Sequence, residues 1–203
     1  MRLSDFDFEL DEELIAQHPP ERRDAARMLV VDRASGSWRD ENFAQLPSLL
    51  RPDDLVVLNN TRVFPARLVG ERVPSGGRVE LLLVGELSDG ELSDGELSDG
   101  ELSGAERAHT WAALVRPARK LSPGARVAFG ADKRLRAEVL EILPDGKRVV
   151  RFECDGDFDA ALRAIGRTPL PPYIKRDAAQ VDRAEDRERY QTVFASRRGA
   201  IAA

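Results

Sequence analysis

The sequence predicts a mixed α/β protein: an α/β domain built from two chain segments, with a small antiparallel six-stranded β-barrel inserted between them. Two patterns lead to this prediction. Six short β-rich runs separated by Gly and Pro turns follow Pro65, and such spacing is typical of a small barrel or sandwich. Before them, residues 55–58 read LVVL without polar alternation, which is typical of a strand covered on both faces. We therefore expect residues 1–64 and 156–203 to form one domain around a barrel at 65–155.

The segment before the barrel alternates short strands and helices. Asp11 suits a helix start because its carboxylate can accept a hydrogen bond from the first turn. The pair His18-Pro19 ends that helix because proline disfavours helical geometry in the residue before it. In order, we expect a half-buried strand at 6–10, a short helix at 11–15, an apolar strand at 28–31, a helix at 43–50 and the buried strand at 55–58.

Turn residues mark the ends of the predicted barrel strands. The tetrapeptides PSGG at 74–77 and PDGK at 144–147 are typical of hairpin turns. The six strands are expected at 67–73, 78–84, 110–115, 125–129, 135–143 and 148–152.

An acidic repeat interrupts the barrel region. Residues 85–104 read GELSD three times and then GELSG, a period of five that matches neither a helix nor a strand. We expect a mobile loop between two barrel strands, without a function of its own, because added loop length costs little stability. This segment holds seven acidic residues and no basic one, so the remaining chain has 31 basic and 29 acidic residues. The net charge of −5 therefore does not argue against an RNA partner.

The chain after the barrel combines helices with a stiff extended segment. A helix is expected at 157–165, ended by Gly166, and a charged helical run at 182–189. Between them, three prolines at 169–172 stiffen the backbone. The residues that this extended segment presents are Tyr173, Lys175 and Arg176.

Composition excludes several classes of protein. Apolar residues make up 42% of the chain and charged residues 33%, which is typical of a soluble globular protein. The single Cys154 excludes an internal disulfide, and no apolar run is long enough to span a membrane, so we expect a cytoplasmic location. The two histidines and the cysteine are not clustered, so no metal site is expected.

The polar turn after residues 55–58 is the first candidate binding site. Asn59, Asn60 and Thr61 follow the apolar run, and Arg62 and Arg67 come next. In α/β proteins, ligands bind at the edge where strands end in loops. An ordinary polar turn after a buried strand explains the same pattern, and both interpretations stay open.

Cation-rich segments stiffened by proline recur along the chain. In the segment 114–124, Arg116, Arg119 and Lys120 lie within five positions, with Pro117 after the first and Pro123 beyond the last. Each such segment alone is equally typical of a solvated turn, but four of them favour an anionic ligand or an RNA backbone. They are residues 15–27, 58–68, 114–124 and 169–176. His18, in the first, is either a loop residue or a catalytic base.

Five blocks in these segments carry a resemblance to a known family. They are IAQHPPERRDAARMLVVDR at 15–33, LVVLNNTRVFPARL at 55–68, LVRPARKLSPG at 114–124, PLPPYIKR at 169–176 and ERYQTVFASRRGAIAA at 188–203. In this order they resemble the S-adenosylmethionine:tRNA ribosyltransferase-isomerases of queuosine biosynthesis, over residues 3–203 apart from the acidic repeat. The resemblance implies an α/β domain with an inserted barrel. It also implies transfer of the ribosyl part of S-adenosylmethionine to 7-aminomethyl-7-deazaguanine at the tRNA wobble position, giving epoxyqueuosine.

The resemblance also implies roles for the candidate residues. Asn59, Asn60, Thr61, Arg62, Arg67 and Tyr173 are expected to bind the small substrates, with Arg62 and Arg67 holding the methionine carboxylate. Arg116, Arg119, Lys120, Lys175 and Arg176 are expected to bind tRNA. The general base is unknown, with His18 as a weak candidate. We expect S-adenosylmethionine as co-substrate, no metal, and a monomer.

Departures from the family pattern add an alternative. The family chain continues past Ala203 through a Pro-Thr-Ala-Gly-Leu-His-Phe block, and Ala26 stands where Ser is usual. The alternative is therefore a truncated, non-catalytic RNA-binding fragment of such an enzyme.

Overall fold

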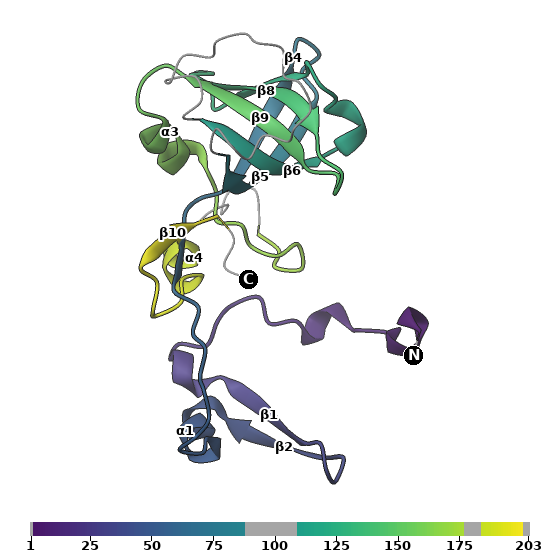
Figure 1. Ribbon diagram of the computed structural model, residues 1–203, viewed down its shortest axis with the longest axis vertical. Helices are drawn as coiled ribbons and strands as arrows, with labels where there is room; N and C mark the ends of the chain where they lie inside the picture. The colour runs from purple at the N-terminus through teal and green to yellow at the C-terminus, as the bar shows by residue number, and fades with distance from the viewer. Residues whose placement is uncertain (1, 88–108, 177–183, 201–203) are drawn as a thin grey trace. The chain divides into compact units, whose positions relative to one another are not determined.

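The computed structural model describes residues 2–87, 109–176 and 184–200 (Figure 1). Their contacts divide the chain into two compact units. One unit contains Met1–Leu58 and Pro171–Arg176, and the other contains Asn59–Leu170 and Asp177–Ala203. This division differs from the expected boundaries, because residues 59–64 and most of the segment after the barrel, all but Pro171–Arg176, group with the barrel. The combination of 1–64 and 156–203 into one α/β domain stays a prediction.

The larger unit is built on a closed barrel of six antiparallel strands, as the sequence predicts (Figure 1). Neighbouring strands follow the order β4-β5-β6-β9-β8-β7, and β4 pairs with β7 to close the barrel. The strands are β4 (Arg67–Val73), β5 (Arg78–Glu86), β6 (Thr110–Arg116), β7 (Arg126–Phe129), β8 (Leu135–Ile142) and β9 (Arg148–Cys154). Each lies within about two residues of its expected range, because alternation and turn residues mark both strand ends clearly.

Alternate residues of each strand fill the barrel interior. Leu81 and Leu83 of β5 and Leu68 of β4 have no exposed surface, and Phe129 of β7 is 1% exposed. Gly70 makes room for Phe129, because a Cβ at residue 70 would lie 2.6 Å from the Phe129 ring. The expected acidic loop begins inside β5, which extends through Gly85 to Glu86, and residues 88–104 lie outside the described residues.

Helix α3 (Phe158–Ile165) covers one part of the barrel. The Asp157 side chain caps its start by accepting a hydrogen bond from the Ala160 amide at 3.1 Å. Phe158 and Leu162, one helical turn apart, are buried in the same apolar cluster as the barrel core. Gly166 ends the helix where a Cβ would lie 2.2 Å from the Pro65 carbonyl oxygen. The predicted helix and its glycine end are therefore both confirmed.

Two short elements complete this unit. Strand β3 (Thr61–Val63) pairs in parallel with β10 (Arg197–Gly199), with Arg62 opposite Arg198. Helix α4 (Ala184–Arg189) confirms the expected helical run within the described residues. The pairing of β3 with β10 joins residues that precede the barrel to residues that follow it.

The smaller unit contains a hairpin and short helical turns. Strands β1 (Arg27–Asp32) and β2 (Ser37–Asn42) pair in an antiparallel hairpin, which confirms the predicted strand at 28–31. The helix expected at 43–50 is a 3-10 turn at Phe43–Gln45 that continues into α1 (Leu46–Leu49). Further 3-10 turns lie at Leu3–Phe6, Glu12–Leu14 and Arg23–Ala25.

Two predicted strands of this unit are wrong. Residues 55–58 are extended but pair with no strand in the described part of the chain, and Leu55 is 89% exposed. Residues 6–10 likewise form no strand, and Phe8 is 77% exposed. An apolar run becomes a strand only where neighbouring strands supply hydrogen bonds and cover its faces. The strands described in this unit, β1 and β2, pair with each other instead.

Candidate anion-binding cavity and basic barrel turn

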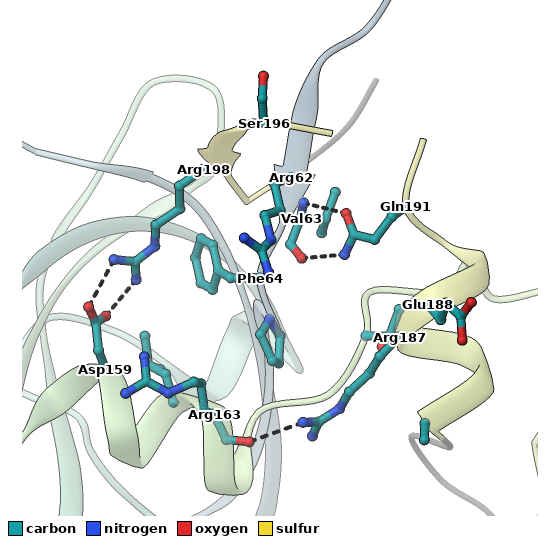
Figure 2. A pocket seen from close by; sticks show the side chains of 14 residues that line it. Arg62, Val63, Phe64, Asp159, Arg163, Arg187, Glu188, Gln191, Ser196 and Arg198 are labelled. Carbon is teal, nitrogen blue, oxygen red and sulfur yellow. Dashed lines mark hydrogen bonds and ion pairs between the residues drawn. The ribbon is translucent and has the colours of Figure 1, made fainter. Parts of the chain in front are cut away.

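A cavity of about 720 Å³ lies in the larger unit, beside β3 and α3 (Figure 2). Its walls come from β3 and the residues that follow it, from α3 and α4, and from β10. Val63, Phe64, Pro65 and Leu162 supply an apolar surface. The polar and charged residues that line the cavity are Arg62, Asp159, Arg163, Thr168, Arg187, Glu188, Gln191, Ser196 and Arg198.

Strand β3, which carries Arg62 into this cavity, is hydrogen-bonded on both edges. On one edge it pairs with β10, and the amides of Ser196 and Arg197 donate to the Asn60 carbonyl at 2.9 and 3.0 Å. On the other edge, the Val63 amide donates to Gln191 Oε1 at 2.8 Å, and Gln191 Nε2 donates to the Val63 carbonyl at 2.7 Å (Figure 2). A single glutamine therefore replaces a neighbouring strand and fixes the backbone beside Arg62.

One ion pair on the cavity wall is complete in itself. Arg198 donates from both terminal nitrogens to the Asp159 carboxylate, at 2.6 and 3.0 Å (Figure 2). The same guanidinium lies 4.9 Å from the centre of the Phe64 ring, a cation–π arrangement. This bidentate geometry leaves little of either charge for a ligand.

The other cations of the cavity are arranged differently. Arg187 donates to the main-chain oxygen of Arg163 at 3.4 Å (Figure 2) and to that of Gly166 at 3.3 Å. The guanidinium groups of Arg62 and Arg163 have no ion pair or hydrogen bond within the described residues. Positive charge therefore exceeds negative charge on this wall, which suits an anionic ligand.

A second basic feature lies on the barrel, at the turn after β6. Residues 118–120 form a 3-10 turn, and Arg116, Arg119 and Lys120 are exposed there. Arg148 of β9, only 7% exposed, lies behind this turn. Its guanidinium donates to the carbonyls of Leu121 at 2.8 Å, Ala118 at 3.2 Å and Gly146 at 2.5 Å.

These hydrogen bonds determine the orientation of the turn. Arg72 adds a further bond from its Nη1 to the Lys120 carbonyl at 3.4 Å. The carbonyls of the turn thus satisfy the buried guanidinium of Arg148 and also accept from Arg72, which is partly exposed. The turn thereby presents basic side chains to solvent on a fixed backbone.

Comparison with known proteins shows the family of this chain. The family described as "Queuosine biosynthesis protein" matches residues 3–203. The chain belongs to this family. It is 42% identical over all 203 residues to an S-adenosylmethionine:tRNA ribosyltransferase-isomerase of Desulfitobacterium hafniense, and 41% identical to one of Halothermothrix orenii. In each case it covers 52% of the relative, so it spans about half the length of these proteins.

A solved structure of the same kind is also similar in sequence. It is the crystal structure of an S-adenosylmethionine tRNA ribosyltransferase from Thermotoga maritima, 32% identical to this chain. The match covers 82% of this chain and 51% of that protein, with a TM-score of 0.35.

Only some of the site residues predicted near β3 line the cavity of this queuosine biosynthesis family member. Arg62 lines it, and the Asn59 side chain accepts a hydrogen bond from the Thr61 amide at 2.8 Å. Arg67 does not line the cavity. Its Nε donates to Glu80 at 2.7 Å and its Nη1 to the Leu170 carbonyl at 3.3 Å. The carboxylate-binding role predicted for Arg67 stays a prediction.

The remaining predicted residues lie in the smaller unit, next to Gln17. Gln17 donates to the Tyr173 carbonyl at 3.0 Å and accepts from the Lys175 amide at 2.7 Å, and Arg176 donates to the Gln17 carbonyl at 3.0 Å. An ion pair between Lys175 and Glu12 lowers the pKa of the Glu12 carboxyl below its usual value. The side chain of His18 is exposed.

Arg148, Arg163 and Gln191 were missed by sequence reasoning. Each has the sequence surroundings of an ordinary polar surface residue: Arg148 follows a hairpin turn, Arg163 lies on an amphipathic helix, and Gln191 follows a charged run. Their importance comes from tertiary placement, which no local pattern reveals.

None of the helices among the described residues is both long and apolar enough to cross a membrane. No group of three or more His, Cys, Asp or Glu side chains in the same part of the chain is arranged to hold a metal ion.

Proposed function

We propose that this chain acts as an S-adenosylmethionine:tRNA ribosyltransferase-isomerase. The reaction transfers and isomerises the ribosyl group of S-adenosylmethionine onto 7-aminomethyl-7-deazaguanine at the tRNA wobble position and gives epoxyqueuosine. The observation that carries the proposal is the match over all 203 residues to relatives of that name at 41–42% identity. Because the chain spans about half of those relatives, the activity is part of the proposal.

The cavity supports a small-molecule role for β3. S-adenosylmethionine carries a carboxylate, and the guanidinium of Arg62 is held in the cavity without an ion pair among the described residues. A guanidinium suits a carboxylate because it can donate two parallel hydrogen bonds. The polar residues Asn59, Asn60 and Thr61 come directly before Arg62 in the chain, and we propose that they bind ribose or adenine.

The basic barrel turn supports an RNA role. Contacts to RNA phosphates need exposed cations held on a fixed backbone, and they do not depend on the RNA sequence. Arg116, Arg119 and Lys120 fit that requirement, since they are exposed on a turn that Arg148 fixes from behind.

We propose that residues 171–176 also contact the substrates. Tyr173 is 54% exposed, and an exposed aromatic ring can stack on an unpaired base. Lys175 and Arg176 extend the same segment, which Gln17 ties to the N-terminal region. We propose a cytoplasmic location, in keeping with the single cysteine of the sequence, and we propose a monomer.

The reaction requires a general base and a general acid. The sulfonium of S-adenosylmethionine acidifies its C5′ hydrogens, so a general base must remove one of them, and adenine leaves more easily when an acid protonates it. No residue of the cavity is assigned either role here. His18 remains the weak candidate for the base.

A second candidate function is a non-catalytic RNA-binding protein. The observation that favours it is the barrel turn, which by itself accounts for RNA affinity without any small-molecule chemistry.

A product assay tests the proposal. The chain is incubated with S-adenosylmethionine and a tRNA that carries 7-aminomethyl-7-deazaguanine, and the digested nucleosides are analysed by mass spectrometry. We expect epoxyqueuosine, with adenine and methionine released in equal amounts. The Desulfitobacterium hafniense relative, assayed in parallel, shows that the tRNA is a competent substrate. Tight tRNA binding with an unchanged wobble base and no adenine release would reject the enzyme in favour of the second candidate.

A further inference from the structure

Two guanidinium groups of the cavity lack partners. Arg62 projects into it from β3, and Arg163 lines it from the last turn of α3 (Figure 2). Neither side chain forms an ion pair or a hydrogen bond within the described residues. The neighbouring cation Arg198 is already saturated by Asp159. The two unpaired groups therefore supply positive charge that the cavity itself does not neutralise.

The elements that carry these groups are fixed. Gln191 and β10 hold the backbone of β3 on both edges, and α3 is anchored in the barrel core through Phe158 and Leu162. The side chains of Arg62 and Arg163 are both exposed, so an anion in solvent can reach them. A negative charge bound beside them is attracted by both guanidinium groups.

We propose that Arg62 and Arg163 together form an oxyanion site in this cavity, for a carboxylate or a phosphate. The inference rests on the proposed function for its ligand, because both S-adenosylmethionine and tRNA carry such groups. The sequence-based expectation paired Arg62 with Arg67. In the structure Arg67 bonds to Glu80 at 2.7 Å and to the Leu170 carbonyl, whereas the Arg163 side chain has no ion pair or hydrogen bond within the described residues.

The side chains lining the cavity also restrict the ligand. Thr168 and Ser196 offer hydroxyl groups, and the apolar wall suits a carbon skeleton next to the charged group. A ligand that combines one oxyanion with an apolar portion matches this lining better than a bare ion does. S-adenosylmethionine meets that description through its methionine part, and a nucleotide through its phosphate and base.

Nuclear magnetic resonance titration of the 203-residue chain tests the site. The probes are inorganic phosphate, S-adenosylmethionine and a tRNA anticodon stem-loop, and the signals followed are the arginine side-chain N–H groups. We expect Arg62→Gln and Arg163→Gln each to weaken the binding of at least one probe by about tenfold or more, as loss of a charged hydrogen bond predicts. Arg163→Lys, which keeps the charge but not the fork, should fall in between.

The control is Arg134→Gln. Arg134 is an exposed arginine of the same unit, paired with Asp132 and outside the cavity lining, so its loss should change every affinity by less than about twofold. Unchanged barrel resonances in all variants show that folding is retained.

The outcomes separate this inference from the proposed function. Binding of phosphate or the stem-loop that depends on both arginines, without S-adenosylmethionine binding, supports the site and removes support for the proposed small-molecule role. S-adenosylmethionine binding that neither substitution weakens overturns the site and leaves the proposed function standing. The site is also overturned if no probe shifts the Arg62 and Arg163 signals, or if Arg134→Gln weakens binding as much as they do.

Discussion

At the scale of single residues, buried Arg148 is the least expected finding. Removing its guanidinium takes one hydrogen bond from each of the carbonyls of Ala118, Leu121 and Gly146, of which Ala118 keeps the bond from the Leu121 amide. We expect Arg148→Met to lower the free energy of unfolding of the barrel by at least roughly 1.5–3 kcal/mol, the contribution of a hydrogen bond to a charged group. Urea unfolding followed by Trp111 fluorescence in a Trp38→Phe background measures it.

The matched control for that substitution is Arg126→Met. The Arg126 side chain is 71% exposed and its contact with Glu138 is long, at 3.9 Å. Its replacement should change the unfolding free energy by less than about 0.5 kcal/mol. Equal destabilisation by both substitutions would show that Arg148 is not a special support of the turn.

The ion pair between Glu12 and Lys175 gives a residue-scale prediction for pH. Lys175 lowers the Glu12 pKa through its hydrogen bond and its charge, so the pair favours the folded contact above the usual carboxyl pKa. That contribution is lost as the pH falls through the lowered pKa of the folded state. In Lys175→Met the Glu12 pKa should return to its usual value, measured by carboxyl-carbon titration. An unchanged pKa would contradict the contact.

At the scale of elements, Gln191 takes the place of a neighbouring strand along the edge of β3 that does not pair with β10. Gln191→Ala removes both hydrogen bonds to Val63, which together contribute about 1–3 kcal/mol. We expect much faster hydrogen exchange at the Val63 amide and weaker binding in the cavity. The same substitution at Gln45, in the smaller unit, should leave Val63 exchange unchanged. Unaltered exchange in Gln191→Ala would show that this edge is protected in another way.

Individual elements also show what could be predicted from sequence. The barrel was predictable because its strands alternate and its turns carry Gly and Pro at 74–77 and 144–147. Residues 55–58 were predicted wrongly because their apolar pattern specifies burial but not the neighbours that provide it. Arg62 was singled out as a cation after the strand expected at 55–58, but that strand is absent and Arg62 lies within β3. Arg163 and Gln191 were not singled out, because they reach the cavity only through the packing of α3 and the course of the chain after α4.

At the scale of the whole molecule, charge is distributed unevenly along the chain. Residues 85–104 carry seven carboxylates, whereas the rest of the chain has two more basic than acidic residues, so the net charge of the whole chain is negative. Carboxylates repel phosphate, so deleting residues 88–104, which follow the end of β5, should leave tRNA affinity unchanged or slightly higher. A filter-binding titration measures it. A marked loss of affinity would mean that the repeat takes part in binding.

The central claim is that one chain holds separate sites for a small anionic substrate and for RNA. Affinities of Arg62→Ala and Lys120→Ala for S-adenosylmethionine and for tRNA, measured across a range of salt concentrations, test it most directly. We predict that Lys120→Ala weakens tRNA binding and lowers its salt slope by about one, without affecting S-adenosylmethionine. Arg62→Ala should weaken S-adenosylmethionine binding by roughly 1.5–3 kcal/mol and leave tRNA binding nearly intact. If Arg62→Ala instead lowers tRNA affinity with the salt signature of Lys120→Ala, the two sites are one RNA surface.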